Sequence, residues 1–275
     1  MELDYEDINT VLVALAEAQD VEEDMREATR ESHHFIDKRD GQWEPDIIHR
    51  MKGRPRYTFD KCNPIVDQIA GELEQADFSI KVRPSGGEAS KDTAKTLDGL
   101  IRNIRNISNG DHVFNAAGRS MITGGFDCWE IVQDWVDADT FDQDLFIRKV
   151  PNAVDRVWFD IGSEMQDRSD ANHCWVLQGL TRKEYEDKFP EGSGLSVGDD
   201  RSDEVYYLKP DLIMVGRILY KKPVKIEIVR TSDGKVYNSE QYDIVKDELA
   251  LAGITEEKRR VRDSWRVYSR LFDGQ

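Results

Sequence analysis

The side chains best suited to chemistry in this sequence are carboxylates, which gather in two short segments. The first segment holds four closely spaced aspartates: Asp137, Asp139, Asp142 and Asp144. Oxygen ligands of this kind can bind Ca²⁺, but the EF-hand pattern also needs a glycine at the turn and a glutamate at the end, and both are missing. A solvated loop between two strands is the simpler interpretation, so we predict no metal site here.

The second segment contains Glu184 and Glu186, followed by Lys188. Together with a remote aspartate, these side chains could form a metal-dependent nuclease site if they lay on a strand pointing into a cleft. The residues from Thr181 to Phe189 instead predict a helix, because Thr181 can cap its start and Glu184 occupies the capping-box position. We therefore predict that the chain is not an enzyme, and keep a metal-dependent DNA-processing enzyme as an alternative.

Nucleophilic and metal chemistry lack a signature as well. Cys62, Cys128 and Cys174 are widely spaced and form no Cys-x-x-Cys pair, which argues against a zinc site or a disulfide framework. His173 precedes Cys174 on a predicted strand, where adjacent side chains point to opposite faces, so the two cannot form a dyad. We expect one of them to be buried and the other partly exposed, and we predict no cofactor.

The composition is that of an acidic protein, which fits either an extended subunit with a large surface or an ordinary acidic enzyme. Among 275 residues, 38 are basic and 55 acidic, which gives a net charge of −17. Proteins that grip nucleic acid usually carry a basic surplus or a basic stripe, so tight general DNA binding is not expected. The hydrophobic fraction of 39% is below the ordinary range, whereas the aromatic fraction of 9% argues against disorder.

Two short basic runs stand out in this acidic chain. One lies between Arg50 and Arg56, where a solvated loop is the simpler interpretation. The other is the candidate interface of the chain, formed by Lys258, Arg259, Arg260 and Arg262. It could contact DNA or an acidic partner, and its alternative interpretation is the solvated beginning of a strand.

The hydrophobic pattern predicts an α+β fold: a long N-terminal helix, a helical middle part with mixed strands, and a strand-rich C-terminal part. Helices are predicted at Asp4–Lys38, Asn63–Glu74, Ala89–Asn106, Asp111–Thr123, Thr181–Phe189 and Tyr242–Leu251. Strands are predicted at Phe78–Val82, Cys128–Val132, Leu145–Val150, Val157–Asp160, His173–Val176, Tyr206–Leu208, Leu212–Lys221, Lys225–Arg230, Lys235–Tyr237 and Val261–Phe272. A hairpin turn is expected at Ser232-Asp233-Gly234.

The most specific stretch runs from the strand at Val157 through an acidic turn, Asp167-Arg168-Ser169-Asp170-Ala171, to the strand at His173. This stretch resembles a segment of the portal proteins of short-tailed phages. Further segments resemble that family in the same order: Asn63–Val66, Ile80–Pro84, Gly124–Phe126 with Trp129, Arg148–Pro151 and Thr181–Phe189. The motif residues, which we expect to be structural, are Trp158, Asp160, Asp167, Ser169, Asp170 and His173.

The resemblance implies a structural role without a reaction. Portal subunits form a ring, commonly a dodecamer, at one capsid vertex, and double-stranded DNA passes through it without sequence-specific binding. The implied partners are identical subunits, terminase, capsid or scaffolding proteins and head-completion or tail factors. The implied location is the virion, with assembly in the host cytoplasm and no membrane. A non-enzymatic adaptor that binds partner helices through its N-terminal segment is a further alternative.

The resemblance also suggests three segments: a helical segment at 1–56, a wing-like α+β domain at 57–204, and a strand-rich part leading toward the stem and clip at 205–275. The last strand runs into Asp273-Gly274-Gln275, a turn signal with no strand after it. Since an open strand edge is a liability, we expect the chain to be truncated relative to the family.

Overall fold

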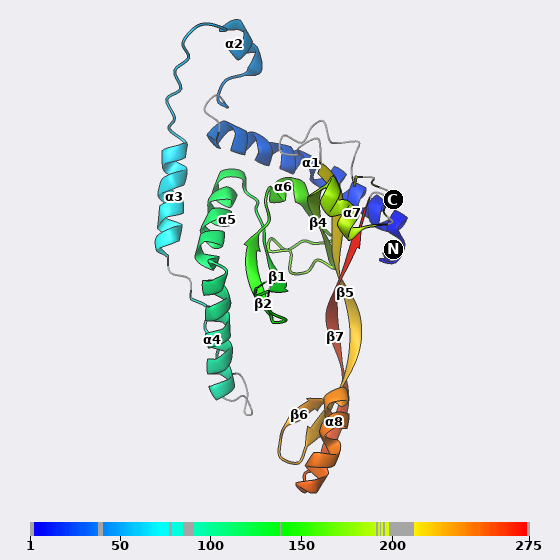
Figure 1. Cartoon of the computed structure of the whole chain (residues 1–275). Coiled ribbons are helices and arrows are strands. Elements are labelled where there is room, and N and C mark those ends of the chain that lie inside the picture. The colour runs from blue at the N-terminus through cyan, green and yellow to red at the C-terminus, as the bar shows by residue number, and fades with distance from the viewer. Residues whose placement is uncertain are drawn as a thin grey trace.

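The computed structural model describes residues 3–37, 41–76, 79–84, 91–137, 139–190, 192, 194, 196–197 and 212–273. Within these residues it contains helices and strands in the α+β arrangement that the hydrophobic pattern predicts. Figure 1 shows three parts: a central core below the helix α1, a column of helices on one side, and a long ribbon that leaves the core. None of the described helices is long and apolar enough to cross a membrane.

The first helix, α1, spans Ile8–Asp37 and confirms the predicted N-terminal helix. Its buried positions recur at helical spacing and begin with Val11, Leu15 and Ala18. The same stripe continues through Arg26 and Thr29, so a charged residue occupies a core position. The opposite side of α1 is exposed to solvent.

Three helices form the column: α3 at Asn63–Gln75, α4 at Lys91–Ile107 and α5 at Gly110–Gly124. They confirm the three predicted helices there. A short helix, α2 at Pro45–Arg50, was not predicted, and it lies apart from the rest of the fold (Figure 1). Its proline occupies the first turn, where a missing N–H is tolerated, and the helix includes the start of the basic run that we expected to be a loop.

The predicted strand at Phe78–Val82 is wrong for its described part. Phe78 lies outside the described residues, and Ile80 to Val82 form no strand. The N–H of Val82 donates to the Asp98 carboxylate on α4 at 3.4 Å instead of to a neighbouring strand. The alternating pattern there reflects a segment lying along a helix.

Two sheets hold the strands of the described residues. The first is the hairpin of β1 at Trp129–Trp135 and β2 at Gln143–Lys149, as predicted. The second contains β3 at Val157–Phe159, β4 at His173–Thr181, β5 at Leu212–Thr231, β6 at Val236–Asn238 and β7 at Glu256–Phe272. Three described helices precede or connect these strands: α6 at Ala153–Arg156, α7 at Arg182–Lys188 and α8 at Ser239–Leu251. Of these, α6 was not predicted.

The strand β5 is 20 residues long and joins two predicted strands into one. We expected a break between Lys221 and Lys225, but the strand continues through Pro223, which is opposite Trp265 of β7. Among the described residues β5 pairs in this stretch with β7 alone, and proline is tolerated at such an edge position. The predicted strand at Tyr206–Leu208 lies outside the described residues.

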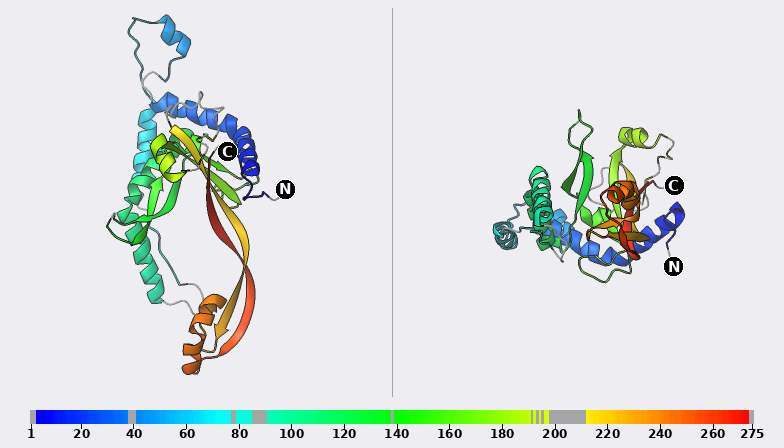
Figure 2. Two further views of the ribbon diagram at one scale, coloured as in Figure 1. Left: turned by 45° about the vertical axis from the view of Figure 1, so that its right-hand side comes forward. Right: turned by 90° about the horizontal axis from the view of Figure 1, so that it is seen from below.

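The last strand, β7, begins at Glu256, five residues before the predicted start at Val261. It pairs antiparallel with β5 over almost its whole length, so one of its edges is covered. Its other edge has no partner strand among the residues that the structure describes. Figures 1 and 2 show the resulting two-stranded ribbon extending from the core to α8 and β6.

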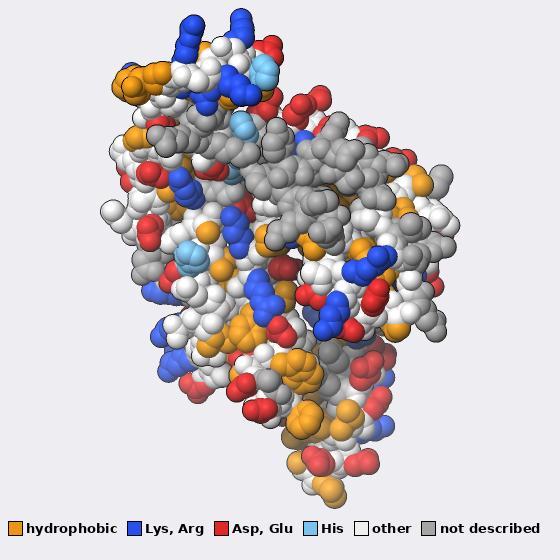
Figure 3. All heavy atoms as spheres, turned by 45° about the horizontal axis from the view of Figure 1, so that its top comes forward, with side chains coloured by type: hydrophobic (Ala, Val, Ile, Leu, Met, Phe, Trp, Pro, Cys, Tyr) orange, Lys and Arg blue, Asp and Glu red, His pale blue; other side chains and the backbone are white. Residues whose placement is uncertain are grey.

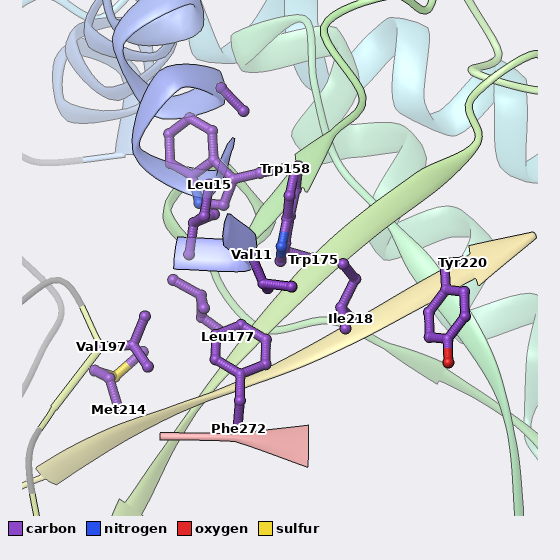
Figure 4. Packing of buried hydrophobic residues seen from close by; sticks show 11 residues of the cluster. Val11, Leu15, Trp158, Trp175, Leu177, Val197, Met214, Ile218, Tyr220 and Phe272 are labelled. Carbon is purple, nitrogen blue, oxygen red and sulfur yellow. The ribbon is translucent and has the colours of Figure 1, made fainter. Parts of the chain in front are cut away.

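The main core lies between α1 and the second sheet (Figure 4). Val11 and Leu15 of α1 pack against Trp175 of β4 and Ile218 of β5. The ring of Phe272 completes this core from the end of β7, and it lies so close to Gly216 that any larger side chain there would clash with it. The core therefore takes residues from all three predicted segments, and the division into those segments stays a prediction.

Candidate functional site

The acidic turn between β3 and β4 is folded by its own carboxylates. Asp170 accepts hydrogen bonds from the Ser163 hydroxyl at 2.7 Å and from the N–H groups of Glu164 at 2.7 Å and Met165 at 3.3 Å. These donors lower the pKa of Asp170 to about 2. A carboxylate surrounded by donors in this way stabilises the turn and is poorly suited to accept a proton.

Asp160 plays the same part at the other end of the turn. It accepts hydrogen bonds from the N–H of Gly162 at 3.0 Å and from the side-chain amide of Asn172 at 2.9 Å. Partial burial opposes ionisation, but these donors outweigh it and lower the pKa of Asp160. The more exposed Asp167 accepts from the N–H of Ser169 at 3.2 Å.

The turn is also tied to distant elements. Arg168, which has a left-handed backbone with φ of 53°, donates to the Ser163 carbonyl at 2.9 Å and to Glu22 of α1 at 3.0 Å. Lys221 of β5 donates to the Ser169 carbonyl at 2.9 Å. The acidic turn thus connects α1 to β5 across the end of the sheet, and its polar atoms are engaged in folding it.

His173 and Trp158 lie on the two strands that flank the turn. The ring of His173 contacts the Tyr5 hydroxyl at 3.4 Å and packs edge-on against Trp175, and burial lowers its pKa. Both His173 and Cys174 are half-buried, so the expectation of one buried and one partly exposed residue is wrong. Burial raises the pKa of Cys174 to about 11, so its thiol is protonated at neutral pH.

A buried arginine that the sequence analysis missed joins α1 to the sheet. The side chain of Arg26 is fully buried and donates to the carbonyls of Val154 at 3.1 Å and Val157 at 2.8 Å. Its guanidinium lies 4.5 Å from the centre of the Trp158 ring, and it pairs with Glu22 of its own helix. Because arginine stays charged in proteins, these partners are needed to offset its desolvation. Its spacing from Val11 and Leu15 was the available signal.

A polar cavity of about 340 Å³ lies between α1 and α5. Its cations are matched by carboxylates: Arg30 pairs with Asp155 at 3.0 Å, and Lys149 pairs with Asp127 at 2.8 Å. Since these charges already have partners inside the protein, they are not free to bind a charged ligand.

The carboxylates considered for metal chemistry do not converge. Asp137, Asp139 and Asp142 lie exposed in the β1–β2 connection and Asp144 at the start of β2. Glu184 forms the predicted capping box with Thr181 at the start of α7, which confirms that helix, and Glu186 pairs with Arg182. Among the described residues no three histidine, cysteine, aspartate or glutamate side chains come together in a way that could hold a metal ion.

The candidate interface at the start of β7 is divided between two faces of the ribbon. Arg259 forms ion pairs with Glu256 at 2.9 Å and Glu227 at 3.2 Å, which raise its pKa. Lys258, Arg260 and Arg262 point to the other face because side chains alternate along a strand. The four predicted residues are therefore exposed together on one strand, but only three share a face.

Large exposed hydrophobic side chains accompany these charges. On the ribbon they include Trp265, Val267 and Leu271, and on the β1–β2 hairpin they include Ile131 and Trp135. Figure 3 shows further hydrophobic side chains at the surface, mixed with acidic ones toward the lower end of that view. Exposed apolar residues in such number mark surfaces that contact other macromolecules.

This chain is similar in sequence to known proteins over nearly its full length. The family described as "Phage P22-like portal protein" matches residues 12–275. A portal protein of Acyrthosiphon pisum secondary endosymbiont phage 1 is 26% identical, over 94% of this chain and 38% of the relative. The chain thus spans well under half the length of that relative. The match begins near the start of α1 and includes both sheets and the ribbon, and on this ground the chain belongs to the P22-like portal protein family.

Proposed function

We propose that this chain is a structural subunit of a phage portal, the ring at one capsid vertex through which DNA is packaged and ejected. The family match over residues 12–275 is the observation that carries the proposal. The acidic turn supports it, because its motif residues are engaged in folding the chain and leave no reactive centre there.

The exposed surfaces fit a subunit whose contacts are completed by neighbours. Obligate interfaces commonly bury more than ~2,000 Å², and their central parts are apolar. Trp265 of the ribbon and Trp135 of the hairpin are 60% and 52% exposed, which is unusual for side chains of this size. A ring of identical subunits would cover them.

The finer features of the role are part of the same proposal. They include a dodecameric ring, docking of terminase during packaging, replacement by head-completion or tail factors, contacts with capsid or scaffolding proteins, and location in the virion after assembly in the host cytoplasm. We also propose that residues 57–204 form the wing-like domain and that residues 205–275 lead toward the stem and clip. The net charge of −17 suits a surface past which DNA slides without sticking.

Electron microscopy and mass measurement test the ring. The purified chain should form annular particles with a central opening, and their mass should be a whole multiple of the 31.7 kDa subunit. The wild type is compared with the variant Trp135→Asp, in which an exposed apolar side chain becomes charged. This variant should form fewer rings, because a ring would cover that position. A wild-type chain that stays monomeric at every concentration would contradict the proposal.

Absence of catalysis is tested separately. Linear and supercoiled DNA incubated with the protein and Mg²⁺ or Mn²⁺ should remain intact. Cleavage that disappears in the variant Asp139→Ala/Asp142→Ala, or in Glu184→Ala/Glu186→Ala, would favour the metal-dependent enzyme instead.

A further inference from the structure

One face of the ribbon carries basic side chains without a carboxylate among them. The pairing of β5 with β7 places alternate residues of each strand on this face. From Lys258 to Phe272, the basic residues on this face are Lys258, Arg260, Arg262, Arg266 and Arg270 of β7, with Lys222 and Arg230 of β5. In a chain with a net charge of −17, this is a strong local concentration of positive charge.

The residues of this face differ in their partners. Close to the core, Arg270 donates to the Tyr5 carbonyl at 2.8 Å, and Lys222 pairs with Glu6 at 3.6 Å, so the start of the chain covers both. Arg230 pairs with Glu257 at 3.3 Å. Four exposed cations on this face have no ion pair or hydrogen-bond partner within the described residues: Lys258, Arg260, Arg262 and Arg266. We call these four residues the basic face.

The outer side of α1 has the opposite character. Four exposed carboxylates on it have no ion pair within the described residues: Glu17, Asp24, Glu27 and Glu31. We call these four residues the acidic face. The arginines of α1 do not neutralise it, because Arg26 is buried and Arg30 is paired with Asp155.

The two faces match in length as well as in charge. From Glu17 to Glu31 the helix rises by about 21 Å. From Lys258 to Arg266 the strand extends by about 26 Å. Each face also includes aliphatic neighbours: Val21 is exposed beside the carboxylates of α1, and the half-buried Ile226 and Ile228 are opposite Arg262 and Arg260. Contact between the faces would therefore combine ion pairs with apolar packing.

The two faces cannot meet within one molecule. Figures 1 and 2 show α1 across the core, whereas the free part of the ribbon extends away from it toward α8. We propose that the basic face of one chain binds the acidic face of α1 in a second copy. This inference rests on the proposed ring function and specifies the surfaces that join neighbouring subunits. A contact between two different surfaces of identical chains produces a ring when its rotation closes.

A second copy suits the ribbon better than nucleic acid does. Duplex DNA would engage the cations but would offer no apolar partner to Ile226 and Ile228 on the same face, whereas the acidic face of α1 lies beside the exposed Val21. The acidic surplus of the chain would also repel DNA, whereas the same surplus supplies the partner surface in a second copy. Duplex DNA is therefore a distinct outcome of the experiment.

The test is a charge-reversal exchange on the whole chain. One variant is Arg260→Glu/Arg262→Glu/Arg266→Glu, and the other is Asp24→Lys/Glu27→Lys/Glu31→Lys. In sedimentation velocity at low salt, each variant alone should associate at least tenfold more weakly than the wild type. An equal mixture should regain association, because the new acidic ribbon of one variant can bind the new basic helix of the other. Added salt should weaken the wild-type contact.

The matched control is Arg50→Glu/Lys52→Glu/Arg54→Glu, at exposed positions around α2. It changes the net charge by the same amount as the ribbon variant. It should associate like the wild type. Association that survives both reversals, or a mixture that fails to recover, would overturn the inference. So would a ribbon variant that loses binding to a labelled 30-base-pair duplex but still associates normally. Rings that resist both reversals would contradict only this contact, whereas a wild type that never associates contradicts the ring itself.

Discussion

The strands β5 and β7 pass through two different environments. In the first, which we call the root, Met214 to Tyr220 of β5 are paired with β4 on one edge and approached by the end of β7 on the other, and α1 covers one face. In the second, the free ribbon, Lys221 to Glu227 pair with β7 and with no other strand among the described residues. The root belongs to the main core, whereas most side chains of β7 in the free ribbon are exposed.

The same face of the ribbon changes its chemistry between the two regions. In the root it presents Ile218 to the main core and Tyr220 to the ring of Tyr5, and in the free ribbon it presents Arg262 and Arg266 to solvent. The alternation of side chains is identical in both regions, so strand geometry does not cause the change. The change marks the place where the chain's own core ends and the proposed contact surface begins.

The largest expected effect is on the free energy of unfolding when a tryptophan of each region is replaced by alanine. Trp175 in the root is fully buried, and Trp265 in the free ribbon is 60% exposed. The substitution Trp175→Ala should reduce the free energy of unfolding by about 3–5 kcal/mol, because it leaves a cavity in the core. Trp265→Ala should change it by less than about 0.5 kcal/mol while weakening association. Urea unfolding of both variants, read by circular dichroism, would contradict the comparison if the two losses were equal.

The next effect concerns the charge that joins α1 to the root. Arg26→Ala should reduce the free energy of unfolding by about 3 kcal/mol, because the buried carbonyls of Val154 and Val157 lose their donor and Glu22 keeps only Arg168 among the described residues. The control is Arg182→Ala, which removes an exposed pair with Glu186 and should cost less than about 0.5 kcal/mol. Thermal unfolding of the two variants side by side measures the difference. Equal melting temperatures would mean that Arg26 does not stabilise the root.

A smaller effect tests the acidic turn that braces the root. The low pKa of Asp170, about 2, means that its ionised form is stabilised by the fold. Its contribution is therefore complete above the ordinary aspartate pKa near 3.8 and is lost as the pH falls toward about 2. Asp170→Ala should lower the melting temperature at pH 7 and flatten its fall in acid. Asp139→Ala, at an exposed loop position, should leave both unchanged.

The smallest effect concerns His173, where β4 meets the start of the chain. Burial lowers its pKa from 6.5, so the unfolded chain takes up a proton before the folded one does. This group therefore contributes to stability above about pH 6.5 and loses that contribution as the pH falls through its folded pKa. The wild type should lose stability between pH 7 and 5 more steeply than His173→Gln. Parallel pH profiles for the two proteins would show that the fold does not protect the imidazole of His173 from protonation.

Local rules made the elements of this protein predictable from its sequence. The spacing of Val11 and Leu15 specified α1, the capping box of Thr181 and Glu184 specified the start of α7, and short apolar runs specified the strands on either side of the acidic turn. These features depend on neighbours within a few residues, which is the range over which backbone preferences and hydrogen bonds act. The shortest helices, α2 and α6, escaped this reasoning because they contain too few residues for a periodic pattern.

Tertiary structure decided which of these surfaces are covered. Alternation alone separates Arg259 from Arg260, but only the pairing with β5 gives Arg259 its partner Glu227 and leaves Arg260 free of one among the described residues. The sequence likewise put Arg26 on the inner stripe of α1, yet its burial depends on carbonyls more than 120 residues away. Periodicity determines which side chains share a face, because it follows from backbone geometry. What covers that face depends on contacts between distant segments, which no local pattern encodes.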